Sequence, residues 1–391
     1  MLTVALMAIG SVTGAYASDS ASLDTPEDAI SFLESQPIEG LDPIDDSVVI
    51  VTPPNTTEGA ILTVDASLSA VPAPGVDTKD VALDPGAIVT IADSTAVPAV
   101  SPDGAVIIGV DGLRPESVVR DPSGVVAGDI NNGGTLVALR PTSSGIQIVS
   151  VIPNNSASEE YEYPLGIPTG AQIYETDNGA YVFEAADQSG LGKIESPWAV
   201  DALGASVPTH FELRGTTLVQ IVEHHTNIFQ YPITADPQWS YTHTAIARTG
   251  NGAIVSGSET AARAMTELRR CFNCSFPVSG APRGYPSNYQ ILNLNASPFS
   301  FINIPAPVRF YKTGPSTEPD WYFIAQTGHF DGAGSRINFD FYKPSGYPVR
   351  IAISATIVKD NGYAQNSTNS YVAKTVWNTF ITNLILNIRR N

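Results

Sequence analysis

Short hydrophobic runs separated by turn-forming residues recur along the chain from Ala60 onward, and this pattern limits the fold more than any other feature. Many of the 30 Pro and 32 Gly stand between runs rich in β-branched or aromatic residues. Such spacing is typical of short strands joined by tight turns and argues against an all-helical fold. In the first part of the chain the predicted strands are 61–64, 87–91, 105–110, 135–139, 146–152, 171–174, 180–183, 210–213 and 217–222.

The last third of the chain repeats the pattern with more aromatic residues. In the run INFDFY, which starts at Ile337, apolar and polar residues alternate, and this period predicts a strand with one buried face. The predicted strands of this region are 290–294, 299–304, 308–311, 321–325, 337–342 and 349–358.

Three helices are predicted around these strands. Thr25 precedes Pro26 and two acidic residues, which is typical of a helix start, and this helix should end before Pro37. Ser256 and Glu259 have the spacing of a capping box, so a second helix is expected to start there and end near Arg270. A terminal amphipathic helix is predicted from an apolar stripe with a spacing of four, made by Val372, Val376, Phe380, Leu384 and Ile388. Its polar face carries Asn and Thr rather than many Lys, which favours packing on a sheet over membrane binding.

The length of 391 residues allows two or three domains. The expected fold class is mainly β, with two β-rich, sandwich-like domains, a short helical connector and a C-terminal amphipathic helix. The expected segments are a signal peptide at 1–17, an acidic helix and linker at 18–59, an acidic β domain at 60–237, a helical connector at 238–270, and a basic aromatic β domain with the terminal helix at 271–391.

The start of the chain resembles a secretory signal. Leu2 to Ile9 are almost entirely apolar, and Ala15-Tyr16-Ala17 precedes a polar region that begins at Ser18. The usual positive region is missing, because no Lys or Arg occurs before Lys79, and the alternative is an ordinary buried strand or helix. No apolar run reaches the ~20 residues that span a bilayer. We therefore expect a secreted, extracellular protein.

Charge divides the chain. Ser18 to Val100 contains 15 acidic residues and one basic residue, and Ser101 to Pro237 contains 17 and 5. Gln238 to Asn391 reverses the balance, with 7 acidic and 14 basic residues. A basic segment on an acidic chain indicates an anionic partner or attraction between the two halves, and the alternative is that both are solvated surfaces.

One stretch of the chain carries a specific sequence motif. Residues 197–239 read PWAVDALGASVPTHFELRGTTLVQIVEHHTNIFQYPITADPQW. They resemble a segment of uncharacterised secreted actinobacterial proteins, in which PWA and DA-G--VPT lead through G-TLVQ-V-H to YP-(T/V)ADP-W. In that family the segment is a shared module ahead of C-terminal regions that differ. The resemblance implies export and a modular layout, and it implies no reaction and no catalytic residue.

Cys271 and Cys274 form a CxxC pair after the predicted helix end. A redox pair profits from a helix N-terminus, and a structural zinc site needs four ligands, whereas this chain has no other Cys. In an exported protein a small structural disulfide is the favoured interpretation.

The histidines indicate no metal site. Adjacent His224 and His225 on a strand would point to opposite faces, so they would need a bulge to share a metal, and the favoured interpretation is that they mark a strand end. His329 and Asp331 lie on a Gly-rich loop near Arg336, which suggests an acid–base site for an anionic substrate such as RNA. The alternative, a plain hairpin loop, is favoured because no second general base can be placed.

The function expected from these features is binding without catalysis. The partner would be a carbohydrate or an anionic polymer of the cell envelope, and the candidate binding residues are Tyr285, Tyr289, Arg309, Trp321, Arg336, Lys343 and Tyr347. The alternative is a secreted toxin or hydrolase, acting on nucleic acid for example, with His329, Asp331 and Arg336 at its centre. No cofactor motif is present, and Asp42, Asp45 and Asp46 are interpreted as linker acids rather than a calcium site.

Overall fold

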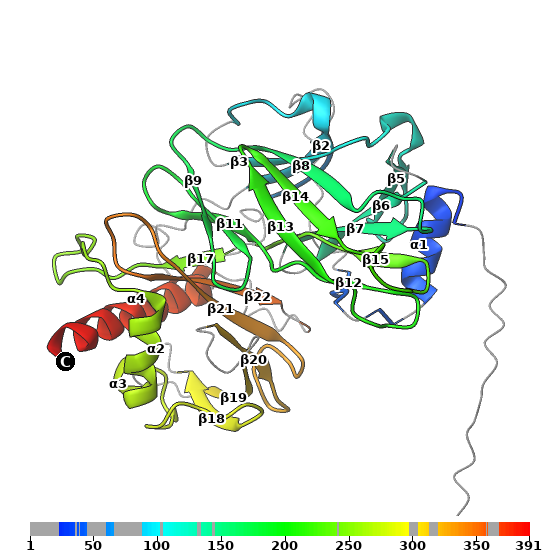
Figure 1. Ribbon diagram of the computed structural model, residues 1–391. Coiled ribbons are helices and arrows are strands. Elements are labelled where there is room, and N and C mark those ends of the chain that lie inside the picture. Colours follow the sequence, from blue (N-terminus) through cyan, green and yellow to red (C-terminus); the bar gives the residue numbers. More distant parts are fainter. Residues whose placement is uncertain are drawn as a thin grey trace, which may run out of the picture.

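The computed structural model describes residues 23–35, 37–38, 40–44, 60–65, 88–101, 105–130, 134–142, 145–240, 242–296, 304–312, 320–356, 358 and 367–391. These residues form three β-sheets in two domains, with a long C-terminal helix (Figure 1). The mainly β fold class is confirmed. The signal-like segment, Asp45, Asp46 and most of the strand expected at 299–304 lie outside the described residues.

The first domain contains two of the sheets. The six-stranded sheet has the order β1 (Ala60–Asp65), β2 (Ile88–Asp93), β3 (Ala105–Val110), β8 (Glu160–Gly166), β14 (Thr217–Val222) and β13 (Thr209–Arg214). The ten-stranded sheet has the order β4 (Val119–Arg120), β5 (Val126–Asp129), β6 (Leu136–Thr142), β7 (Gly145–Ile152), β16 (Gln238–Ser240), β11 (Gly190–Ile194), β10 (Tyr181–Glu184) and β9 (Gln172–Glu175). Off this path, β15 (Ile233–Ala235) pairs with β7 and β12 (Ala199–Val200) pairs with β15. The main hydrophobic core takes buried side chains from both sheets, so the sheets pack face to face as a sandwich.

The central strands β6 and β7 are buried along their whole length because both of their faces are covered. Val137 and Leu139 point into the sandwich, whereas Leu136 and Ala138 contact helix α1 (Pro26–Ser35) on the other side. This helix begins as predicted. The Thr25 hydroxyl accepts a hydrogen bond from the Asp28 amide, and the Asp28 carboxylate accepts one from the Thr25 amide at 2.9 Å.

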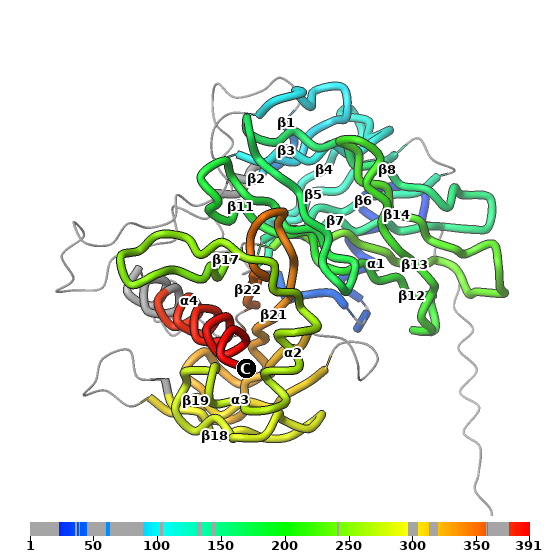
Figure 2. The backbone as a smooth tube through the Cα atoms, turned by 60° about the vertical axis from the view of Figure 1, so that its left-hand side comes forward, coloured from blue at the N-terminus to red at the C-terminus, as the bar shows by residue number. Residues whose placement is uncertain are grey.

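The second domain is one antiparallel sheet covered by helices. Its order is β17 (Thr242–Ala245), β22 (Arg350–Thr356), β21 (Arg336–Tyr342), β20 (Trp321–Ala325), β19 (Ile304–Lys312) and β18 (Ile291–Ala296). The terminal helix α4 (Ser367–Arg390) lies across it next to α2 (Ala261–Arg270) and α3 (Phe272–Ser275), as Figures 1 and 2 show. Phe339 and Phe341 of β21 pack against Phe380 and Leu384 of α4 in one aromatic core.

Helix α2 differs from the prediction at its start. Its N-cap is Thr260, whose hydroxyl accepts from the Arg263 amide, and not Ser256. Glu259 instead accepts from Arg389 Nε at 2.7 Å and ties the helix start to the end of α4. Cys271 and Cys274 form a disulfide at the junction of α2 and α3, with Cα atoms 5.3 Å apart, as the sequence predicts.

The two domains meet through the polar face of β21 and β22. The chain passes from the first domain to the second between β16 and β17. Helix α2 follows this crossing and packs on α4, so it belongs to the second domain. On β21, Asn338, Asp340 and Tyr342 point away from the helices, and they pair in register with Ser354, Ala352 and Arg350. This face is covered by the first domain, where Lys193 and Asn178 contact Asp340.

Candidate functional site

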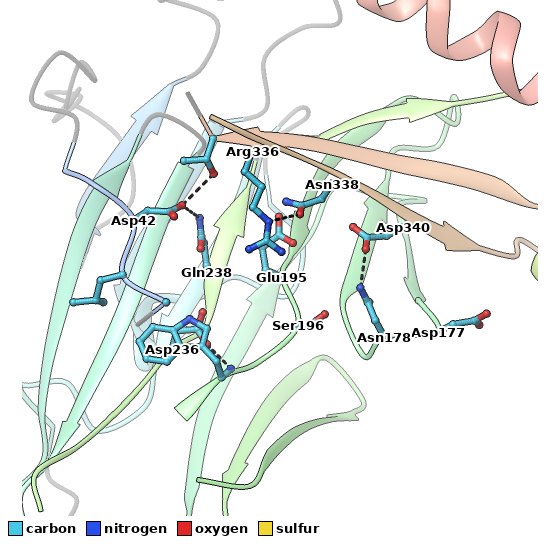
Figure 3. Close-up of a pocket in the computed structure, with 14 residues that line it drawn as sticks. Asp42, Asp177, Asn178, Glu195, Ser196, Asp236, Gln238, Arg336, Asn338 and Asp340 are labelled. Carbon is cyan, nitrogen blue, oxygen red and sulfur yellow. Dashed lines mark hydrogen bonds between the residues drawn. The ribbon is translucent and has the colours of Figure 1, made fainter. Parts of the chain in front are cut away.

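A cavity of about 580 Å³ lies where the two domains meet (Figure 3). Carboxylates, amides, hydroxyls, one guanidinium and one indole line it. The lining residues are Gly40, Leu41, Asp42, Asp177, Asn178, Glu195, Ser196, Trp198, Asp236, Gln238, Arg336, Asn338, Asp340 and Thr356. They come from three separate parts of the chain, so the cavity exists because the domains are docked.

Part of the wall from the first domain comes from the two ends of the segment 197–239, which supply Trp198, Asp236 and Gln238. Strands β12 and β15 bring these ends together through the pair Ala199 and Ala235. Asp236 then accepts a hydrogen bond from the Trp198 amide at 3.0 Å. Trp239, next along β16, is fully buried against Phe183, which anchors this wall in the sandwich core.

The wall from the second domain is the polar face of β21 and β22. Arg336 lies over the ring of Tyr322, 4.0 Å from its centroid, and its Nε donates to Asn338 at 2.7 Å. In the view of Figure 3 its side chain extends into the cavity between Gln238 and Asp340.

The segment 40–44 completes the site and fixes it to both domains. The Asp42 carboxylate accepts from Gln238 Nε2 at 2.8 Å and from the Thr356 hydroxyl at 3.2 Å. Gly40 has a φ of 97° and lies on the Trp198 ring, where an added Cβ would come within 2.6 Å of the indole. Glycine is therefore required for the close contact and for the backbone conformation.

A buried ionic cluster forms the part of the site between β11 and β21. Lys193, whose side chain is fully buried, contacts Asp340 and lies 2.6 Å from Glu195 Oε2. Asn178 donates to Asp340 at 2.7 Å, and Ser354 donates to Glu195 at 2.8 Å. Burial alone would lower the pKa of Lys193, but the two carboxylates raise it above its usual range. Lys193 in turn outweighs the effect of burial on Glu195 and lowers the pKa of that carboxyl.

Asp236 is the least satisfied polar group of the cavity. The residue is 1% exposed, and its Oδ2 atom has no hydrogen-bond partner in the described part of the chain. Burial raises the pKa of Asp236 well above its usual range, and repulsion from Glu195 and Asp42 adds to this effect. A buried polar atom without a partner costs free energy, and a hydrogen-bond donor on a ligand in the cavity would remove this cost at Asp236.

A second buried pair lies beside the cavity without lining it. Arg350 donates to both oxygens of Glu184 at 2.5 and 2.6 Å, and the Tyr342 hydroxyl donates to the same carboxylate. Tyr347 covers Arg350, with the guanidinium carbon 4.9 Å from the ring centroid. Tyr347 therefore serves the domain interface rather than an exposed binding platform.

The structure does not assemble the predicted aromatic platform. Trp321 is 1% exposed inside the aromatic core, so its prediction as a binding residue is wrong: it belongs to the face of β20 that α4 covers. Tyr285 packs edge-on against Trp321 and Phe310. Tyr289 is 64% exposed and contacts Tyr311.

The predicted cations are also dispersed. Arg309 is on β19, and its Nε is buried. Lys343 donates to the backbone oxygens of Pro344 and Tyr347. Of the predicted binding residues, Arg336 lines the cavity. The other polar residues of the cavity were not predicted as binding residues from the sequence. The only local signal for Asp236 was the Ala-Asp-Pro sequence near the end of segment 197–239.

His329 and Asp331 lie in the loop between β20 and β21. His329 Nδ1 accepts from the Asp331 amide at 3.1 Å, and Ser335 donates to the Asp331 backbone oxygen, as in a hairpin turn. Burial lowers the pKa of His329 to about 4 and raises the pKa of Asp331 to about 6. Neither residue lines the interdomain cavity, whereas Arg336 does, so the three residues of the predicted acid–base site are not brought together there.

His224 and His225 lie just beyond the end of a strand, which is the interpretation favoured from the sequence. Strand β14 ends at Val222, and the two histidines lie in the following turn with ring centroids 4.3 Å apart. His224 is buried, and its ring nitrogens contact the Tyr231 hydroxyl and the Ser158 carbonyl. Burial lowers the pKa of His224, which keeps it neutral in this structural position.

In the residues that the structure describes, no group of three or more His, Cys, Asp or Glu side chains is arranged to hold a metal ion. None of the helices described is both long and apolar enough to cross a membrane.

Comparisons with known proteins give little. No family model and no curated protein matches the chain. Among solved structures, the di-domain ARO/CYC StfQ from the steffimycin biosynthetic pathway is 8% identical with a TM-score of 0.26, and the match covers 69% of this chain and 85% of that one. DynU16, from the dynemicin biosynthetic locus, is 6% identical with a TM-score of 0.23 over 68% of this chain and 86% of that one. Scores this low support no statement about function.

Proposed function

We propose that the chain is a secreted, non-enzymatic saccharide-binding protein whose ligand occupies the cavity between the two domains. The observation that carries this proposal is the cavity itself. Its volume of about 580 Å³ lies within the roughly 300–1,000 Å³ of small-molecule sites, and polar groups from both domains converge on it.

The chemistry of the lining suits a ligand with many hydroxyl groups. Sugar hydroxyls both donate and accept hydrogen bonds, and the cavity offers acceptors on Asp42 and Asp236 and donors on Asn178, Gln238 and Arg336. Trp198 adds an apolar surface of the kind that stacks on sugar rings. The disulfide and the signal-like N-terminal segment support a location outside the cell.

An anionic envelope polymer suits this cavity less well than a saccharide. Five carboxyl-bearing side chains line it, against Arg336 in the lining and the buried Lys193 that pairs with Glu195 and Asp340, so carboxyl groups remain in excess and disfavour an anionic ligand. Part of the basic character of the second domain is also neutralised inside the protein, because Arg350 pairs with Glu184 and Arg389 pairs with Glu259.

A glycan array probed with the full-length, disulfide-bonded protein tests the proposal. Ser196→Tyr would project a ring into the cavity and should abolish binding. Ser206→Tyr places the same ring at an exposed position outside the cavity lining and serves as the matched control. Binding that survives Ser196→Tyr but is lost in Tyr289→Ala would instead locate the site on the exposed aromatic surface.

The location is tested separately. N-terminal sequencing of protein from culture supernatant should give a mature chain that starts near Ser18. A cytosolic protein with an intact Met1 would contradict secretion.

A further inference from the structure

We infer that the interdomain cavity selects a saccharide that carries an ammonium group, with Asp236 as a residue that receives this group. The inference rests on the proposed function and names the ligand class of that same site. Two observations carry it: the excess of carboxyl groups in the lining, and the buried Asp236 oxygen without a partner.

The carboxyl groups of the cavity differ in how they are neutralised. Glu195 and Asp340 share Lys193, which compensates for their charge inside the protein. The Asp42 carboxylate accepts hydrogen bonds from neutral groups, the amide of Gln238 and the hydroxyl of Thr356, and its nearby cation is Arg140, whose Nη2 donates to the Asp42 backbone oxygen at 3.1 Å.

Asp236 also has a neutral partner, because it accepts one hydrogen bond from the Trp198 backbone amide. Its second oxygen is free, and Glu195 and Asp42 repel it. A positive charge placed in the cavity would offset this repulsion and favour the ionised form of Asp236. An ammonium group has three N–H donors, so one can reach Asp236 Oδ2 while the others contact neighbouring acceptors.

The remaining lining argues for a sugar as the carrier of this charge. A bare metal ion needs several ligands in one coordination sphere, and among the described residues no group of three acidic, His or Cys side chains is so arranged. An unbranched polyamine would leave Asn178, Asn338 and Ser196 without hydrogen-bonding partners from the ligand. An amino sugar supplies a cation and hydroxyl groups in one molecule of suitable size.

The test compares two disaccharides that differ in one functional group per ring. The β-1,4-linked glucosamine disaccharide and cellobiose share a backbone, and the first has an amine where the second has a hydroxyl at C2. Isothermal titration calorimetry at low salt should show that full-length protein binds the glucosamine disaccharide about tenfold or more tightly, as expected for a charge-assisted hydrogen bond. Digalacturonic acid should bind more weakly than cellobiose.

Asp236→Asn keeps the shape and removes the ionisable group. It should remove the preference for the glucosamine disaccharide and leave the affinity for cellobiose nearly unchanged. Asp111→Asn, at an exposed position outside the cavity, should change neither affinity. If Asp236→Asn does not fold, Asp177→Asn at the exposed part of the lining should reduce the preference without loss of structure.

The outcomes separate this inference from the proposed function. Equal binding of the glucosamine disaccharide and cellobiose, or binding of neither, overturns the choice of an ammonium-bearing sugar. The proposed function then stands or falls on the glycan array and the Ser196→Tyr variant. A preference that persists unchanged in Asp236→Asn overturns the role of Asp236.

Discussion

Replacement of Lys193 should weaken the coupling between the two domains more than replacement of an exposed charged residue. Lys193 is fully buried and neutralises Glu195 and Asp340, which belong to different domains. Lys193→Met retains the length of the side chain and leaves two buried carboxylates without their counterion. Loss of one partner from a buried ion pair costs about 3–5 kcal/mol, against a total stability of about 5–15 kcal/mol for a typical domain.

The interface has little apolar contact to compensate for this loss. Its hydrophobic cluster contains the buried residues Val182, Tyr342 and Ala352, with Tyr174 packed beside them. The larger cores lie within the separate domains. Differential scanning calorimetry should therefore show that Lys193→Met unfolds in two steps at lower temperature, because the domains lose their coupling.

Two controls isolate the charge. The triple variant Lys193→Met/Glu195→Gln/Asp340→Asn removes all three charges together and should recover most of the lost stability. Arg214→Met breaks an exposed pair with Glu160 and should cost less than about 1 kcal/mol. If Lys193→Met costs no more than Arg214→Met, the buried cluster does not hold the domains together.

Three further predictions concern single sites. Burial raises the pKa of Asp320 well above its usual range, so the native state keeps a proton whose stabilising effect is complete at low pH and is lost as the pH rises. The Asp320→Asn variant should therefore gain stability relative to the wild type between pH 4.5 and 7, by at most about 1.4 kcal/mol per pH unit. Parallel pH profiles of Tm for the two proteins would contradict this. Cys271 and Cys274 should resist alkylation without a reductant, and the double Ser variant should lose about 2 kcal/mol in urea denaturation, whereas two alkylated thiols in fresh protein would refute the disulfide. Gly192→Ala would place a Cβ 2.0 Å from the Trp239 ring and should cost about 1–3 kcal/mol, and an equal loss in the open-surface control Gly250→Ala would show that this contact is not the cause.

Local patterns in the sequence predict the strands well but not the surface that covers them. The period of INFDFY correctly places Phe339 and Phe341 in the core. The same period assigns Asp340 to a solvated face, yet Asp340 is 3% exposed because the first domain covers that face. A residue pattern reports which side of a strand is apolar, and it does not report whether the polar side meets water or another domain.

Two different reasons explain why several strands were not predicted from the sequence. The alternation of Tyr161, Tyr163 and Leu165 with Glu160 and Glu162 was a usable signal for β8, and its burial follows that period. Strands β12, β15 and β16 contain only two or three residues and have no period to detect. Their positions depend on long-range pairing, of β15 and β16 with β7, of β16 with β11 and of β12 with β15, which no local window contains.

The cavity could not be predicted for the same reason, and its construction has a consequence for specificity. Trp198, Asp236 and Gln238 come from the segment 197–239, whereas Arg336, Asn338 and Thr356 come from the second domain. If other proteins share this segment and differ in their C-terminal regions, as the resemblance of residues 197–239 implies, the residues that this segment gives to the cavity would stay constant and those from the second domain would change. Asp236 would then supply a common anchor, while the polar face of a strand pair such as β21 and β22 would set which ligand fits against it. Exchange of residues on that face should therefore change ligand choice without removing the site, because the anchor is held by the sandwich core of the other domain.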